Sequence, residues 1–309
     1  MRKIAIAILA LALLLPLASC CKDDPPEPTT TAAPATTTEP ATAQASPGEA
    51  ELRALLEKEI EKQILDFKYG DYDSNGTYEA FAFVGEAQDP EEDEGYTGEI
   101  WFVSATGARM LEEGGYFGLI EVVTFGGSSF AVMDQYATTG GFVSVWGVRG
   151  GKPRRESISN AGGGMKQIDG KDFTLWHSTY DAMFDTELGF GLGHTWKNYW
   201  FYWDGESFHE YGGVKITEAQ LRKCEGAAAV LDGIKKDGET IGEIFYRGNG
   251  IINVNHAAEN GQDRRNSFTL LQLDGTKVTV VEAEDNSGFY LPALAPDIAV
   301  YPELPQIFN

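Results

Sequence analysis

The chain has few cysteines and few positive charges. Two of its three cysteines are adjacent near the N-terminus, so only Cys224 lies in the main part of the chain and a disulfide framework is excluded. Lysine and arginine together number 24 against 47 aspartates and glutamates, which gives a net charge of −23. Because contacts to phosphate need clustered basic side chains, this balance excludes a nucleic-acid-binding protein and electrostatic docking on anionic lipid.

Common catalytic patterns are also missing. The four histidines form no HExxH pair, there is no GxSxG sequence, and the glycine run 162–164 lacks the spacing of a phosphate-binding loop. Acidic residues are too numerous for a glycosidase pair to be assigned, because that chemistry depends on the distance between two carboxylates. The sequence therefore favours a non-catalytic protein, and an enzyme remains the alternative.

The long apolar run of the chain lies at its N-terminus, over residues 4–17, after two basic residues. This pattern predicts a secretory signal peptide over residues 1–19, and the run is too short to span a bilayer stably. The segment 17–20, Leu-Ala-Ser-Cys, resembles the lipobox of bacterial lipoproteins. The resemblance implies that Cys20 becomes the lipid-modified N-terminus and anchors the protein to the cell membrane on the extracytoplasmic face.

Residues 20–48 are rich in proline, threonine and alanine and contain no aromatic side chain. Such a stretch buries too little apolar surface to offset its ordering entropy, so it predicts a disordered tether. As a flexible coil it would span roughly 30 Å, and in an extended polyproline form about 85 Å. We therefore expect a folded domain over residues 49–309 that is held away from the membrane.

The folded part changes from a helical to a strand-like spacing of apolar residues. Leucines and isoleucines predict an N-terminal helix over residues 49–65, and Thr217 caps one inserted helix predicted over residues 217–236. Between and after them, strand pairs with tight glycine turns recur, each preceded by another strand-like run. This repetition predicts an all-β, β-propeller-like domain of about four to five blades, with a β-sandwich as the alternative.

Residues 70–79 carry the strongest chemical signal. Oxygen side chains recur at Asp71, Asp73, Asn75 and Glu79, and Thr77 offers a backbone carbonyl between them. Ca²⁺ takes about six to eight oxygen ligands, and a tightly turned loop with a central glycine can bring that many together. The same residue types are also typical of a plain turn without an ion.

The loop is not an EF-hand, because Ala82 stands at the twelfth position, where an EF-hand has glutamate. It resembles the calcium loop of FG-GAP and VCBS repeats, which run into an apolar strand as residues 81–85 do here. Glutamate stands at the last ligand position, where those repeats have aspartate. The resemblance implies a structural Ca²⁺ with five ligand residues in this chain: Asp71, Asp73, Asn75, Thr77 and Glu79.

The densest aromatic segment, residues 196–203, contains Trp196, Trp200 and Trp203. On a strand, alternate side chains face the core and the solvent. The outward set of tryptophans could stack on the sugar rings of a glycan, and the inward set would pack in the core.

These features predict a membrane-anchored extracytoplasmic lipoprotein that acts as a non-catalytic binding or interaction module with a structural Ca²⁺ loop. Its expected partners are the membrane, through the lipid anchor, and an unknown surface ligand, either a glycan or a protein. The alternative is a secreted hydrolase or lyase that acts on polysaccharide. Catalysis would require a deep pocket with two close carboxylates, or a histidine–carboxylate pair, of perturbed pKa.

Overall fold

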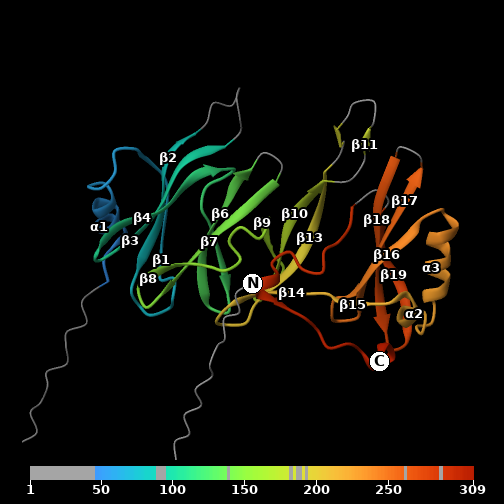
Figure 1. Ribbon diagram of the computed structural model, residues 1–309. Helices are drawn as coiled ribbons and strands as arrows, with labels where there is room; N and C mark the ends of the chain where they lie inside the picture. The colour runs from blue at the N-terminus through green and yellow to red at the C-terminus, as the bar shows by residue number, and fades with distance from the viewer. Residues whose placement is uncertain are drawn as a thin grey trace, which may run out of the picture. The chain divides into compact units, whose positions relative to one another are not determined.

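Strands make up most of the folded chain in the computed structural model shown in Figure 1. The structure describes residues 46–87, 95–137, 140–180, 184–185, 190–191, 194–260, 263–284 and 288–309. The predicted signal peptide, Cys20 and nearly all of the predicted tether lie outside these residues. Within the described part of the chain, no helix is long and apolar enough to cross a bilayer.

The first half of the domain consists of two antiparallel meanders, in which each strand pairs with the next along the chain. The pair Tyr116–Gln135 joins them into one eight-stranded sheet. The first meander contains β1 (Gln63–Gly70), β2 (Glu79–Ala87), β3 (Tyr96–Ser104) and β4 (Gly107–Tyr116). The second contains β5 (Glu121–Phe125), β6 (Ser128–Ala137), β7 (Gly140–Arg149) and β8 (Lys152–Arg155).

Two further sheets follow, each of five strands. The third meander contains β9 (Gly163–Gln167), β10 (Asp172–Tyr180), β13 (His194–Trp203) and β14 (Phe208–Tyr211), and β20 (Ala299–Val300) joins it in parallel to β14. The short pair β11 (Phe184–Asp185) and β12 (Phe190–Gly191) stands between β10 and β13 in the chain. The fourth meander contains β15 (Val214–Ile216), β16 (Thr240–Tyr246), β17 (Ile251–Asn260), β18 (Asp263–Asp274) and β19 (Lys277–Glu284).

The predicted all-β class is confirmed. The expected hairpins are present as β3–β4, β7–β8, β13–β14 and β18–β19, each preceded by the strand that the alternation predicts. The larger sheets are antiparallel apart from the β14–β20 pair, and none of them closes on itself among the residues that the structure describes.

Successive meanders share apolar cores. The first and second pack together through a cluster that includes Phe83, Tyr116 and Trp146. The second and third pack through a larger cluster that includes Phe125, Phe173 and other aromatic side chains, and Phe268 of the fourth meander extends it. Burial of such side chains stabilises the fold by about 1.5–3 kcal/mol each. The cores therefore link the meanders in chain order.

Helices cover the outer faces of the first and fourth meanders. α1 (Glu49–Leu56) packs Leu52 and Leu56 on the first. The last turns of the chain, η1 (Pro296–Ile298) and η2 (Gln306–Phe308), follow the fourth meander. η2 joins α2 (Glu218–Leu221) and α3 (Ala227–Lys236) in one apolar cluster with that meander.

Both predicted helices are shorter than the apolar spacing indicated. Residues 63–65, expected to end the first helix, begin β1, because their backbone pairs with β2 from Gln63–Gly85 onward. The inserted helix over 217–236 is broken into α2 and α3. Gly226 between them has φ 87°, and Glu225 exchanges backbone hydrogen bonds with the edge of the fourth meander. In both places pairing with a sheet overrides local helical spacing.

Two hydrogen bonds attach the residues just before α1 to the chain next to β1 and β2. Ser46 Oγ accepts a hydrogen bond of 2.6 Å from the backbone amide of Tyr78. The hydroxyl of Tyr69 donates to the carbonyl oxygen of Pro47 at 2.9 Å. The residues before α1 are thus held against the loop that precedes β2.

Candidate metal centre

The loop between β1 and β2 brings three carboxylates together. One carboxylate oxygen each of Asp71, Asp73 and Glu79 lies within 4.8 Å of the other two. Calcium–oxygen distances are about 2.3–2.6 Å, so two oxygens bound to one ion lie at most about 5 Å apart. The three side chains, which we call the carboxylate cluster, are therefore close enough to bind one ion together.

Asp71 holds the loop in shape. Its carboxylate accepts hydrogen bonds from the backbone amides of Asn75 at 3.0 Å and Gly76 at 2.9 Å. Gly76 has φ 84°, a conformation that glycine adopts without strain. The hydroxyl of Ser74 donates to the carbonyl oxygen of Gly127 at 2.9 Å, which ties the loop to the β5–β6 turn. The position of the cluster is thus set by contacts outside the loop as well as within it.

Glu79 is the member of the cluster whose environment most needs an explanation. As the first residue of β2 it is 0% exposed, and neither of its carboxylate oxygens has a hydrogen-bond partner of ordinary geometry. Burial raises the pKa of Glu79 to about 7, the charges of Asp73 and Asp71 add to the effect, and the backbone amide of Tyr72 opposes it. Because a buried, unpaired carboxylate is costly, the site favours either a proton or a cation at Glu79.

The ligand atoms of the cluster are all oxygens, which suit hard cations such as Ca²⁺ or Mg²⁺ better than zinc or copper. Of the five residues predicted to bind Ca²⁺, the structure brings Asp71, Asp73 and Glu79 together. Asn75 is exposed, and its Oδ1 accepts a hydrogen bond of 2.6 Å from the amide of Thr77. Backbone carbonyls or water would therefore complete the coordination of a bound ion.

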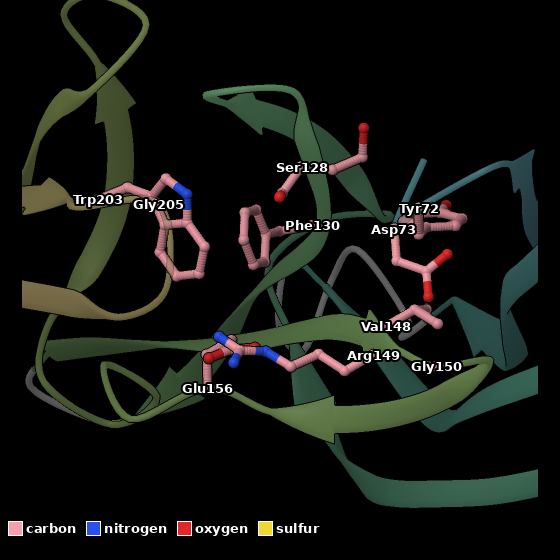
Figure 2. Close-up of a pocket in the computed structure, with 11 residues that line it drawn as sticks. Tyr72, Asp73, Ser128, Phe130, Val148, Arg149, Gly150, Glu156, Trp203 and Gly205 are labelled. Carbon is pink, nitrogen blue, oxygen red and sulfur yellow. The ribbon is translucent and has the colours of Figure 1, made fainter. Parts of the chain in front are cut away.

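Asp73 also lines a cavity of about 300 Å³, which we call the Asp73 cavity (Figure 2). Figure 2 shows Asp73 at one end and Trp203 at the other, with the side chain of Arg149 running toward Glu156. Glu156 is 3% exposed, its Oε2 has no hydrogen-bond partner, and burial raises its pKa against the effect of nearby arginines. The indole N–H of Trp203 is also unpartnered. Polar groups thus converge beside the carboxylate cluster.

The three tryptophans named from the sequence do not share one surface. Trp196 and Trp200 lie on the same face of β13 and are 61% and 49% exposed. Trp203 lies on the opposite face, is 5% exposed and packs edge-on against Phe130 with 5.0 Å between ring centroids. Trp200 lines a separate cavity, considered below, whereas Trp203 lines the Asp73 cavity. Only the two outward tryptophans offer an exposed ring face.

One histidine takes part in a buried polar network. Nδ1 of His256 contacts a carboxylate oxygen of Glu239, and Nε2 lies 3.0 Å from the hydroxyl of Thr269. This order of groups is that of a nucleophile, base and acid. However, Thr269 is 3% exposed and His256 is 4% exposed, so a substrate has no access to the hydroxyl. The network therefore joins β17, β18 and the residue before β16 rather than forming a reactive site.

Sequence reasoning did not single out Glu156 or Arg247. Both are buried and each has a polar atom without a hydrogen bond. Neither belongs to a recognisable motif, and their burial results from contacts between meanders, so no local pattern indicates them.

No known protein-family model matches the chain. A comparison with curated proteins likewise finds no match.

Proposed function

We propose that this protein is a lipid-anchored, extracytoplasmic binding module that is not catalytic and whose first meander is stabilised by one Ca²⁺. The observation that carries the calcium proposal is Glu79, a fully buried carboxylate without a hydrogen bond of ordinary geometry, close to Asp71 and Asp73. A single divalent cation would neutralise the cluster and give these oxygens partners. The ion would be structural, because it would join the β1–β2 loop to the start of β2.

We further propose a propeller-like architecture of four blades, one for each meander. Its support is the chain-order pairing within each meander and the apolar clusters between successive meanders. A β-sandwich would instead divide the strands between two facing sheets. In successive blades of this kind the loops at the strand ends project from the sheets, which suits recognition of a glycan or protein at a surface.

Calcium titration calorimetry of wild-type protein and Asp73→Asn tests the proposal. Asparagine keeps an acceptor for the amide of Gly151, which now donates to Asp73 at 3.3 Å, and removes one negative charge. We expect one Ca²⁺ per chain and at least about tenfold weaker binding in the variant. Glu86→Gln, an exposed position on β2, is the matched control. Absence of binding at millimolar Ca²⁺, or equal binding by all three proteins, would contradict it.

A hydrolase or lyase acting on polysaccharide is the second candidate, and the Asp73 cavity favours it. Two carboxylates, Asp73 and Glu156, line this cavity, and burial raises the pKa of Glu156 as a general acid requires. Polysaccharide cleavage that is lost in Glu156→Gln with the fold intact would establish this function instead.

A further inference from the structure

A cavity of about 430 Å³ lies between the third and fourth meanders. Its volume falls within the range of about 300–1,000 Å³ that is typical of small-molecule sites. One wall is formed by β10, β13 and β14, and the other by residues 247–249, by β17, β18 and β19, and by the segment after β19. We call it the Arg247 cavity, after the charged residue in its wall.

Arg247 is 7% exposed, and the buried carboxylate of Glu210 attracts its charge, but not every donor of the guanidinium is hydrogen-bonded. Its Nη1 donates to the carbonyl oxygen of Leu291 at 3.3 Å, and Nη2 has no hydrogen-bond partner. The guanidinium lies against the rings of Tyr199 and Tyr290, at 5.6 and 5.2 Å from their centroids. Rings favour the charge but accept no conventional hydrogen bond, so Nη2, which is buried beneath the cavity surface, has no acceptor, and the guanidinium contributes its positive charge to the cavity wall.

An aromatic surface stands on the opposite wall. Trp200 is 49% exposed although it borders the cavity, and Tyr211 lies in the same wall. The hydroxyl of Tyr211 donates to Asp172 Oδ1 at 2.9 Å, and its ring lies 4.6 Å from that of Tyr202. These contacts hold Tyr211 in place, and the exposed half of Trp200 is open to a flat, partly apolar ring.

The other polar side chains that line the cavity include two carboxylates and the amide of Asn249. Asp172 and Glu282 both line it, and a carboxylate has about four lone-pair sites, so the bond from Tyr211 leaves Asp172 with capacity to accept more. Two carboxylates repel a ligand with several negative charges such as a phosphate ester. They can, however, accept hydrogen bonds from hydroxyl groups. The cavity thus combines one cationic group, several hydroxyl acceptors and one aromatic face.

We propose that the Arg247 cavity binds a sugar residue that carries a single carboxylate, a uronate. The carboxylate would pair with the positive charge of the Arg247 guanidinium, the ring would stack on Trp200, and ring hydroxyls would donate to Asp172 and Glu282. This inference rests on the proposed role as a binding module and names its ligand class, but it does not depend on the calcium ion or on the Asp73 cavity.

The test is titration calorimetry of the whole protein with the methyl glycosides of galacturonate, glucuronate and mannuronate, each of which carries one carboxylate. Each is compared with the neutral methyl glycoside that has a hydroxymethyl group in place of the carboxylate. We expect at least one uronate to bind about tenfold or more tightly than its neutral counterpart, because a charged interaction is lost in the latter. Arg247→Gln should remove that preference, and Trp200→Ala should weaken binding about five- to tenfold.

Trp196→Ala is the matched comparison, since Trp196 lies on the same face of β13 but outside the cavity. Equal loss in Trp196→Ala and Trp200→Ala would place the ligand on the open sheet face and overturn the assignment to the cavity, while leaving a glycan-binding module in place. Equal affinity for charged and neutral glycosides, or no binding of any methyl uronide at millimolar concentration, would overturn the ligand class. Arg247 is buried, so if Arg247→Gln fails to fold, the charged-to-neutral ratio and the Trp200→Ala result still decide the question.

Discussion

Replacing Glu79 by glutamine should have opposite effects with and without calcium. In the calcium-free protein Glu79 is a buried carboxylate that repels Asp73 and Asp71, and glutamine removes this repulsion. In the calcium-bound protein the same change removes a charged ligand. The substitution is nearly isosteric, so a difference in side-chain volume is not expected to contribute.

The calcium-free effect follows from the pKa of about 7 that burial gives Glu79, against an ordinary value of 4.5. Because the folded state holds its proton to higher pH than the unfolded state, stability falls as pH rises from about 4.5 to 7 and is level above that. Each pKa unit corresponds to about 1.4 kcal/mol, so ionised Glu79 costs the folded state about 3 kcal/mol at pH 8. An unpartnered buried amide costs about 1–3 kcal/mol. We therefore expect Glu79→Gln in EDTA at pH 8 to be at least as stable as the wild type.

The calcium effect follows from mass action. With a Kd of about 10⁻⁴ M, typical of the tighter extracellular calcium modules, 10 mM Ca²⁺ is about 100 times Kd and stabilises the folded state by about 2.7 kcal/mol. For a domain of this size that corresponds to a rise in Tm of about 5–10 °C. Glu79→Gln should lose most of this rise, so the two melting curves exchange order between EDTA and calcium.

Thermal melts followed by circular dichroism at pH 8, in EDTA and in 10 mM Ca²⁺, measure both effects. Glu86→Gln, the same chemical change at an exposed position of β2, should melt like the wild type in both buffers. The reasoning is refuted if Glu79→Gln keeps the full calcium-dependent rise, or if it is several kcal/mol less stable than the wild type in EDTA.

Three other perturbations follow from the fold. Gly98→Ala should destabilise the protein by about 1–3 kcal/mol or more in a denaturant titration. The added Cβ would fall on the carbonyl oxygen of Val84 and 2.9 Å from Cα of Gly85. Gly118 has open space around it, so Gly118→Ala should be near neutral. Phe308→Ala should lower the free energy of unfolding by about 3–5 kcal/mol in the same assay, because this ring is 1% exposed within the apolar cluster under α2 and α3. An unfolding midpoint equal to that of the wild type would show that the C-terminus does not hold this cluster together. Hydrogen bonds from the amides of Ser207 and Glu206, and to a lesser extent from His209, lower the pKa of Asp204 to about 2. An NMR titration of His209→Ala should therefore show a moderate rise in the pKa of Asp204. An unchanged pKa would argue against the 2.9 Å contact between the His209 ring and the Asp204 carboxylate. The sign is that of a depressed carboxyl pKa: the stabilisation is present above about pH 4 and is lost as pH falls toward 2.

The hairpins could be predicted from sequence because their signals are local. At Asp274-Gly275, for example, Gly275 has φ 60° in the turn that joins β18 to β19. The end of the first helix could not, because residues 63–65 fit a helical spacing and become strand only by pairing with β2, which lies further along the chain. The same distinction applies to the sites. Asp71, Asp73 and Glu79 are close in sequence and could be grouped by their spacing, and the bound ion remains a prediction. The roles inferred for Glu156 and Arg247 depend on burial between meanders, which spacing does not show.

The contacts of Ser46 and Pro47 bear on how the domain responds to mechanical tension. If Cys20 is held in a membrane, a pull along residues 20–45 is first applied to the bonds that Ser46 and Pro47 make with Tyr78 and Tyr69, and then to α1. Tyr78 directly precedes Glu79, so an ion at the carboxylate cluster would stiffen the point where the load enters. The force needed to peel the first meander open would then rise with the concentration of calcium around the protein.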